Sequence, residues 1–477
     1  MLGVAGLHLP VSELHSGSQP RIGRSRSPKT VIIIGAGLAG LVSAYELTKA
    51  GHAVTLLEAQ ARPGGRVLTL RKPFPDGLYA EAGASFFSDS HNYTLQYVRF
   101  FQLPIQPVRL LDPPVHYHVR GKLITVAASG RADWPFALTP TEVGLGLYGM
   151  LDTYVRSKLG EVGDPTEPGW PPAALVKYDG ITFEEFFRRQ GASPGALTLL
   201  RPIYGLLGDG IGSVSALQVL RDAAIGFSGK QWYSVKGGND QLADAFAAHL
   251  ADKIWYKTQV VNIQHDARTV TATILQAGMT RTLTADFLIC AVPHPALRQI
   301  EVVPRFSREK QTAIDDLSST SVSRIFLQTS RKFWLDKDPR TRIYTDLPVM
   351  NVSHATVGQP GHRGILQAYL SGTQARRIAA MQESARVSYI RQHMQYVYPG
   401  ISDHFEAGVS KSWDHDRWSG GAYAWFKPGQ MQAFIPYLAR PERRLHFAGD
   451  YTSPWPGWMQ GALYSGVRVA HEIDTLA

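Results

Sequence analysis

A run of β-branched residues that ends in closely spaced glycines, VIIIGAGLAG at residues 31–40, constrains the fold of this chain more than any other feature. Its first four residues suit a strand that is buried on both faces. Gly35, Gly37 and Gly40 fit the pattern G-x-G-x-x-G, which provides a tight turn, a close approach of the backbone to a pyrophosphate, and close packing of a helix on the strand. The N-terminus of the following helix would present free N–H groups and a partial positive charge to the phosphates.

A second predicted strand, HAVTLLE, ends at Glu58, which lies 23 residues after Gly35. An acidic residue at this position binds ribose hydroxyls and disfavours the 2′-phosphate of NADP. Strand, glycine turn, helix, strand and terminal acid together predict a dinucleotide site. They do not distinguish NAD from FAD.

The next residues, EAQARPGGRVLT, resemble the extended fingerprint of FAD-binding proteins. The resemblance implies that Gly64 and Gly65 approach the flavin half of the cofactor and that Arg66 meets its phosphate. A polar turn between strands would explain the glycines but not the whole string.

Two distant segments, WDHDRWSGGAYAWFKPG (413–429) and FAGDYTSPWPGWMQGALYSGVRVAHEI (447–473), resemble the closing segments of the flavin amine oxidases. VKGGNDQLADAFAAHL and ADFLICAVP extend this resemblance in blocks from about residue 30 to the end. The chain is similar to monoamine, polyamine and L-amino acid oxidases as a group. The resemblance implies further cofactor contacts at Gly83, Ala84, Ser85, Val260, Trp413, Gly449, Asp450, Trp458, Met459 and Ala462.

The closing segment also has a physical interpretation. Trp458, Met459 and Gln460 follow a turn rich in Pro and Gly and precede a helical pattern, so they should lie at a helix N-terminus. Free amides there can stabilise negative charge on a reduced flavin. By resemblance, Tyr423 and Trp458 are the two aromatic residues that flank the amine in front of the flavin; the alternative is that both are core aromatics.

Three positions depart from the family. Ala422 stands where monoamine oxidases carry a cysteine bonded to the flavin, so FAD should be held non-covalently. Arg324 replaces a common lysine that holds a water near flavin N5; it keeps the charge but does not readily lose a proton. Phe86 stands where L-amino acid oxidases tend to place an arginine that binds the substrate carboxylate. It therefore favours an amine without a carboxylate, unless another arginine takes over.

The predicted fold class is α/β with an α+β substrate lobe. The FAD-binding domain is expected to be Rossmann-like, of the glutathione-reductase and amine-oxidase type, and discontinuous over 31–90, 235–300 and 430–477. A sheet-based substrate-binding domain is predicted over 91–136 and 301–429, a helical lobe over 137–234, and a poorly ordered tail over 1–30.

The resemblance implies an FAD-dependent amine oxidase. Hydride would pass from the α-carbon of a neutral amine to flavin N5, water would hydrolyse the imine, and O2 would reoxidise the flavin to give H2O2. Because the amine must be neutral, we expect activity to rise on the alkaline side. The alternatives are an L-amino acid oxidase that gives a 2-oxo acid, ammonia and H2O2, and a flavin demethylase or desaturase-like oxidoreductase.

Composition limits the partners. The net charge is +10, but the basic residues are scattered, which argues against nucleic acid binding. The single cysteine, Cys290, lies in an apolar run and is expected to be a buried thiol, and no histidine spacing predicts a metal site. No apolar run is long enough for a membrane span. We expect a cytoplasmic enzyme acting on a small-molecule amine or amino acid with O2, and a homodimer is left open.

Overall fold

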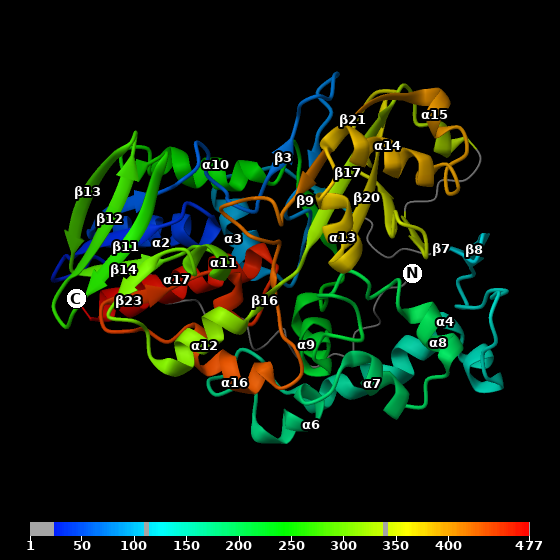
Figure 1. The fold of residues 1–477 in the computed structure, drawn as a ribbon, viewed down its shortest axis with the longest axis horizontal. Helices are drawn as coiled ribbons and strands as arrows, with labels where there is room; N and C mark the ends of the chain where they lie inside the picture. The colour runs from blue at the N-terminus through cyan, green and yellow to red at the C-terminus, as the bar shows by residue number, and fades with distance from the viewer. Residues whose placement is uncertain (1–22, 109–113, 337–341, 477) are drawn as a thin grey trace.

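The computed structural model describes residues 23–108, 114–336 and 342–476 (Figure 1). Most of the predicted N-terminal tail, residues 1–22, lies outside the described residues. The described part begins just before β1 (Thr30–Ile34), where the amide of Ser25 donates to the carbonyl of Ala50 at 2.8 Å.

A five-stranded parallel sheet contains the predicted strand–turn–helix–strand unit. Its order is β10 (Ile254–Trp255), β2 (Ala53–Leu57), β1, β14 (Phe287–Cys290) and β23 (Leu445–Phe447), so chain segments from both halves of the sequence lie side by side. Residues 31–34 of β1 are buried, as expected for a strand covered on both faces. Cys290, in β14, is buried as well.

Helices α2 (Leu38–Ala50) and α17 (Met459–Thr475) pack against each other on this sheet, α10 (Asp240–His249) packs beside α2, and all three lie close to the sheet in Figure 1. A Cβ at Gly466 of α17 would lie 2.3 Å from a methyl carbon of Val42, so the two helices approach closely at a glycine. Ser43 also donates to the carbonyl of Gly466 at 3.1 Å. The first and last helices of the described chain are thereby held together.

A four-stranded sheet lies beside the parallel sheet. Its order is β13 (Met279–Ala285), β12 (Val270–Gln276), β11 (Thr258–His265) and β15 (Glu301–Val303). Its apolar side chains share a core with β1, β14 and β23.

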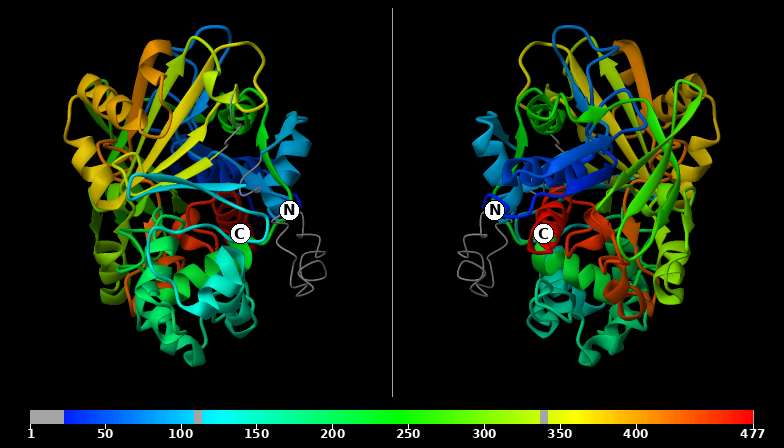
Figure 2. Two further views of the ribbon diagram at one scale, coloured as in Figure 1. Left: turned by 90° about the vertical axis from the view of Figure 1, so that its right-hand side faces the viewer. Right: turned by 90° about the vertical axis from the view of Figure 1, so that its left-hand side faces the viewer.

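A seven-stranded sheet lies at the end of the molecule away from the four-stranded sheet (Figures 1 and 2). All eight residues of its strand β17 (Val322–Thr329) are buried, as expected for an inner strand of a sheet that is covered on both faces. Helices α13 (Gly372–Ala379), α14 (Glu383–Met394) and α15 (Ile401–His404) lie against this sheet. The strand order is β21 (Phe405–Ser412), β17, β20 (Gly364–Ser371), β19 (Asn351–His354), β18 (Arg342–Thr345), β7 (Val115–Val119) and β8 (Lys122–Val126).

Short helices form the lower part of the molecule in Figures 1 and 2. They pack around a fully buried group of Phe183, Phe186 and Phe187. The last of them, α9 (Ala216–Arg221), continues into a π-helical turn, η3 (Asp222–Gly226). The others are α4 (Pro140–Tyr154), η1 (Arg156–Lys158), α5 (Leu159–Val162), η2 (Ala173–Leu175), α6 (Val176–Asp179), α7 (Phe183–Arg189) and α8 (Pro194–Leu200).

Short strands and connecting helices complete the described chain. Three small sheets are formed by β3 (Thr69–Leu70) with β4 (Ala80–Glu81), by β5 (Phe87–Ser88), β9 (Trp232–Val235) and β6 (Ile105–Pro107), and by β16 (Ser318–Ser319) with β22 (Ala424–Trp425). The remaining helices are α3 (Asn92–Phe100), α11 (His294–Leu297), α12 (Arg308–Asp316), η4 (Phe333–Leu335), α16 (Gln430–Leu438) and η5 (Asp450–Thr452).

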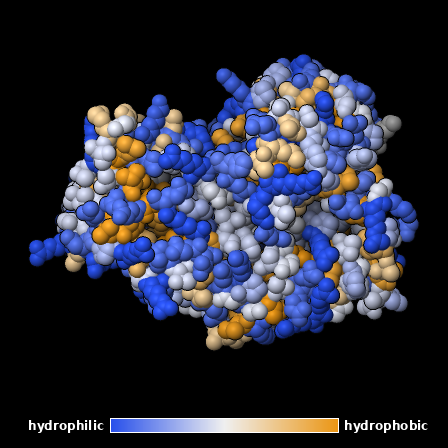
Figure 3. Space-filling view, in the orientation of Figure 1, coloured by the Kyte–Doolittle hydropathy of each residue, from blue (hydrophilic) through white to orange (hydrophobic). Residues whose placement is uncertain are grey.

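The α/β fold class predicted from the sequence is confirmed. The division into domains stays a prediction. Within the described residues, no helix has both the length and the apolar character that crossing a membrane would require. On the face shown in Figure 3, hydrophilic and hydrophobic residues are interspersed over all parts of the molecule.

Candidate active site

One cavity is lined by residues of the parallel sheet, the seven-stranded sheet and the short-helix region. Its lining includes every residue of the predicted cofactor set except Gly40, together with Phe86, Arg324, Ala422 and Tyr423. The fold therefore gathers on one surface side chains that are separated by up to about 430 positions in the sequence.

The two glycine loops meet at one end of this cavity. The amide of Gly64 donates to the carbonyl of Ala36 at 2.8 Å, and a Cβ at Gly65 would lie 3.5 Å from the Cα of Gly37. A Cβ at Gly37 itself would meet nothing within 4 Å, so it would project into open space at the cavity wall. Because Gly37 caps the N-terminus of α2, the free amides of the first turn are available to a phosphate beside it.

Gly40 has a different position from the other glycines. It is buried and does not line the cavity. A Cβ there would lie 1.9 Å from the carbonyl oxygen of Gly35, so the absence of a side chain allows α2 to pack against the turn after β1.

Glu58 lies at the end of β2 and is buried. Its two carboxylate oxygens accept hydrogen bonds from the amides of Ala36, at 2.7 Å, and Gln60, at 2.8 Å. Burial raises the pKa of Glu58 above its ordinary value, and the two backbone hydrogen bonds oppose that rise. The carboxylate thus ties the end of β2 to the glycine turn while still lining the cavity.

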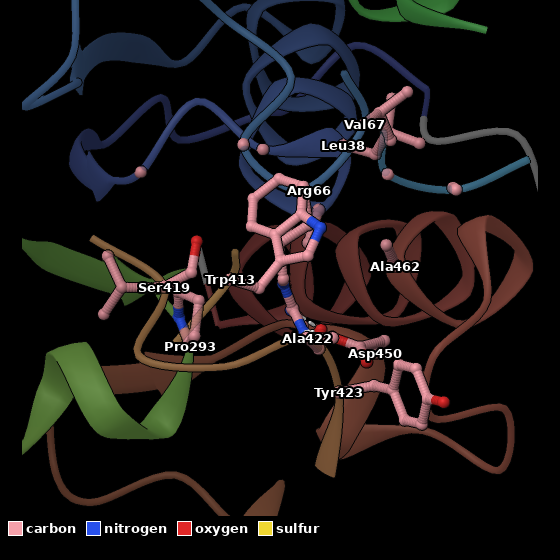
Figure 4. Close-up of a pocket in the computed structure, with 18 of the residues that line it drawn as sticks. Leu38, Arg66, Val67, Pro293, Trp413, Ser419, Ala422, Tyr423, Asp450 and Ala462 are labelled. Carbon is pink, nitrogen blue, oxygen red and sulfur yellow. Dashed lines mark hydrogen bonds and ion pairs between the residues drawn. The ribbon is translucent and has the colours of Figure 1, made fainter. Parts of the chain in front are cut away.

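Arg66 connects the second glycine loop to two distant parts of the site (Figure 4). Its guanidinium donates to the carbonyl of Ala422 at 2.6 Å and to a carboxylate oxygen of Asp450 at 2.5 Å. The other carboxylate oxygen of Asp450 accepts from the amide of Gly457 at 2.7 Å, which fixes the turn before Trp458. Charge-assisted hydrogen bonds of this kind are stronger than neutral ones, so they hold these three chain segments together.

The N-terminus of α17 faces the same cavity. Trp458 is its N-cap residue, Met459 is the first helical residue, and both line the cavity. The amides of Met459 and Gln460 have no acceptor within the helix, because the first amides of any helix lack one. They supply a partial positive charge to whatever lies against this end.

Phe86 lies among aromatic side chains. Its ring centroid is 5.4 Å from that of Trp232 and 5.8 Å from that of Trp458, in edge-to-face arrangements. Trp458 also packs against Phe227 at 5.1 Å and against the buried ring of His91 at 4.9 Å. Burial lowers the pKa of His91 to about 4, so this ring is neutral near pH 7.

Tyr423 lies below Ala422 and Asp450 in the view of Figure 4. Its hydroxyl donates to the carbonyl of Leu206 at 2.5 Å and lies 3.5 Å from the hydroxyl of Tyr369. Burial raises the pKa of Tyr423 well above its ordinary value, and the neighbouring Tyr369 adds to the rise. The phenol is therefore neutral and acts as a hydrogen-bond donor.

Arg324 extends from β17 to the cavity. One of its Nη atoms donates to the carbonyl of Glu81 at 2.7 Å and to the hydroxyl of Ser85 at 2.5 Å. Its guanidinium carbon lies 4.3 Å from the centre of the Tyr369 ring. Its buried Nε has no hydrogen-bond partner among the described residues.

Sequence reasoning missed one wall of the cavity. Gln218 comes from α9, Asp222 from η3 and Tyr369 from β20. Leu206 and Leu207 lie in the turns between α8 and α9, and Phe227 follows η3. No motif marks these residues, and Asp222 follows Arg221 in a stretch that reads as an ordinary helix surface. Only tertiary contacts bring them to the cavity, such as those of Leu206 with Tyr423 and of Phe227 with Trp458.

The features of this cavity fit FAD: two glycine loops in contact, the N-termini of α2 and α17, and an acid at the end of β2. A model of the family described as flavin containing amine oxidoreductase matches residues 38–474, and the chain belongs to this family. The protein is an FAD-dependent oxidoreductase that acts on amines, as the sequence predicts.

Relatives agree with this assignment. A putative L-amino-acid oxidase, YobN of Bacillus subtilis, is 31% identical over 95% of this chain and 96% of its own length. The L-amino-acid oxidase BmooLAAO-I of Bothrops moojeni is 28% identical over 94% of this chain and 90% of its own length.

Solved structures share the fold. Cyclohexylamine oxidase from Brevibacterium oxydans superposes with a TM-score of 0.80 at 22% identity and covers 94% of this chain and 99% of its own. Wild-type putrescine oxidase bound to putrescine gives a TM-score of 0.78 at 22% identity with the same coverage.

Removing the Tyr423 hydroxyl should separate its structural role from the role of the ring. In the Tyr423→Phe variant the carbonyl of Leu206 loses its donor, so we expect the free energy of unfolding to fall by about 1 kcal/mol. FAD content should stay unchanged because the ring remains. Denaturant unfolding and the flavin absorbance of the purified variant measure the two effects; loss of flavin would show that the hydroxyl, rather than the ring, supports the cofactor.

Proposed function

We propose that this chain catalyses the oxidative deamination of an amine without an α-carboxylate, with non-covalently bound FAD as cofactor and O2 as electron acceptor, giving H2O2. The observation that carries this proposal is the surroundings of Phe86. Its contacts with Trp232 and Trp458 make an apolar wall. A substrate carboxylate against this wall would be desolvated without a positive partner, which is unfavourable.

The bound FAD supplies the hydride acceptor and the electron chemistry. Tyr423 and Trp458 flank the amine, exclude water and orient its C–H bond. The free amides at the start of α17 would stabilise negative charge on the cofactor. Arg324 contributes a fixed positive charge on the same cavity, and Ala422 offers no thiol for a covalent bond to the flavin.

An L-amino acid oxidase is the second candidate. It is supported by the two relatives named as L-amino-acid oxidases and by the buried, unpartnered Nε of Arg324. In this alternative the carboxylate would meet Arg324 instead of position 86. A guanidinium with an unused donor is a suitable partner for it.

Peroxide production by the purified protein distinguishes the two candidates. The matched substrates are phenethylamine against phenylalanine, tyramine against tyrosine, and putrescine against ornithine. Turnover of the amines alone supports the proposal, and turnover of the amino acids alone overturns it in favour of the second candidate. Oxygen consumption measured in parallel tests O2 as the acceptor; reduction of the flavin without oxygen uptake would contradict that part.

The variant Arg324→Met makes the comparison sharper. If Arg324 binds a carboxylate, kcat/KM for phenylalanine should fall roughly 10- to 100-fold more than kcat/KM for phenethylamine, since a hydrogen bond to a charged group contributes about 1.5–3 kcal/mol. An equal loss for both substrates would place Arg324 near the cofactor rather than the carboxylate.

A further inference from the structure

We propose that Asp222 selects substrates that carry a second positive charge, as in a diamine or an amino acid with a cationic side chain. This inference rests on the proposed function, because it concerns the far end of the same substrate. It is drawn from a buried ion pair that presents its negative member to the cavity.

Asp222 begins the π-helical turn η3 and lines the cavity, with 13% of its side chain accessible. Its carbonyl accepts from the amide of Phe227 at 3.0 Å, and Phe227 packs against Trp458. A Cβ at Gly226, in the same turn, would lie 2.9 Å from the indole nitrogen of Trp458. The turn that carries Asp222 is thus packed directly on the predicted aromatic site.

Arg221, the partner of Asp222, does not line the cavity. Its guanidinium donates to one carboxylate oxygen of Asp222, at 3.0 and 3.2 Å, and lies 5.7 Å from the ring centre of Phe426. The Arg221 side chain is only 1% accessible. Because the cation is turned into the protein and the carboxylate lines the cavity, the pair presents a negative end to a bound substrate.

Several neighbours act on the charge of Asp222. Burial raises the pKa of Asp222 above its ordinary value, while Arg221 and a hydrogen bond from Gln218 oppose the rise and favour the carboxylate. The negative charge also acts on Tyr423, where it adds to the rise in the pKa of the phenol. Asp222 and Tyr423 line the same cavity.

The other acidic residues that line the cavity have partners near the glycine loops, and the remaining charged residues that line it are positively charged. Among the described residues that line it, the acidic ones are Glu58, Asp222 and Asp450, and the basic ones are Arg66, Arg324 and Arg417. Glu58 binds backbone amides at the glycine turn, and Asp450 binds Arg66. Asp222, in η3, is therefore the acidic lining residue that lies away from the glycine turn and from Arg66. A second ammonium group of the substrate would be attracted to its carboxylate.

The test compares substrates that differ only at the far end. Putrescine is compared with n-pentylamine, and ornithine with norleucine, because a methyl group then replaces the ammonium group at the same chain length. We expect the wild-type holoenzyme to prefer the charged member of the pair it oxidises. Asp222→Asn should reduce that preference in kcat/KM by about 10- to 100-fold, mainly through KM, as expected for the loss of one hydrogen bond to a charged group.

Controls address folding, because Asp222→Asn leaves a buried guanidinium without its carboxylate. The double variant Arg221→Gln with Asp222→Asn removes both charges and should show the same loss of preference. Asp209→Asn is the matched control. Asp209 pairs with Arg376 at 2.8 Å but does not line the main cavity, so its loss should leave the preference unchanged.

Failure of the inference and failure of the proposed function give different results. Binding of each compound to the oxidised holoenzyme is followed anaerobically by the change in flavin absorbance. An unchanged preference in a flavin-loaded Asp222→Asn or double variant, or no preference in the wild type, overturns the role of Asp222. Turnover of ornithine without turnover of any amine overturns the proposed substrate class, yet the ornithine–norleucine comparison still decides whether Asp222 reads the distal charge.

Discussion

Replacing Gly40 by alanine is expected to destabilise the protein by about 3 kcal/mol or more, since overpacking a close contact typically costs 1–3 kcal/mol and more where backbone must move. The new Cβ would lie 1.9 Å from the carbonyl oxygen of Gly35 and 3.3 Å from the Cβ of Ala291. The Gly35 oxygen belongs to the turn between β1 and α2. Relief of the clash therefore requires the helix to move away from the strand.

Thermal unfolding followed by circular dichroism, together with the yield of soluble protein, measures this effect. Gly144→Ala is the matched control, because Gly144 lies within α4 and a Cβ there meets nothing within 4 Å. That control should be neutral or stabilising by up to about 1 kcal/mol, the difference in helix propensity between the two residues. Equal melting of the Gly40→Ala variant and the wild type would show that α2 does not depend on this contact.

The Gly37→Ala variant is expected to fold normally and to lose affinity for FAD. The backbone at Gly37 has φ −71° and ψ 173°, a conformation open to alanine, and the added methyl would meet no protein atom within 4 Å. It would instead occupy cavity space where the backbone is expected to approach the pyrophosphate. A steric cost of about 1–3 kcal/mol corresponds to a roughly 10- to 100-fold weaker binding of FAD.

Titration of the apoprotein with FAD, followed by flavin fluorescence, measures this change. The far-UV circular dichroism and melting of the apoprotein should match those of the wild type. If the variant binds FAD with unchanged affinity, the pyrophosphate does not approach Gly37, and the assignment of this loop to the cofactor is wrong. The Gly40→Ala and Gly37→Ala variants thus test two reasons for a glycine in this motif: close packing of the helix on the turn, and close approach of the backbone to the cofactor.

The two loops illustrate how far local sequence could predict the site. The spacing of glycines indicates where the backbone must turn tightly or approach another group closely. Positions from Gly35 to Gly65 could therefore be interpreted before the fold was known. The N-terminus of α17 could be predicted for the same reason, because a turn rich in Pro and Gly precedes a helical pattern. The roles assigned to the cofactor and substrate residues remain predictions.

Phe86 and Arg324 were recognised from the sequence only as departures from the flavin amine oxidase pattern. Their surroundings required the structure. Phe86 lies against Trp232, which is in β9, while Arg324 bonds to Ser85 and stacks on Tyr369. Neither set of neighbours is close in sequence, so no local pattern could indicate what either side chain contacts.

The sequence by itself determined the α/β class, the flavin-binding unit and the family, because these depend on short-range backbone constraints and on motifs that are continuous in the chain. The tertiary structure decided which residues of the short helices and of β20 line the cavity, and it showed that Asp222 rather than Arg221 does so. The physical reason is that the exposure and charge environment of a side chain depend on elements brought together by packing. The sequence does not indicate which of the adjacent residues Arg221 and Asp222 faces the cavity. The fold buries Arg221 and leaves Asp222 at the cavity wall.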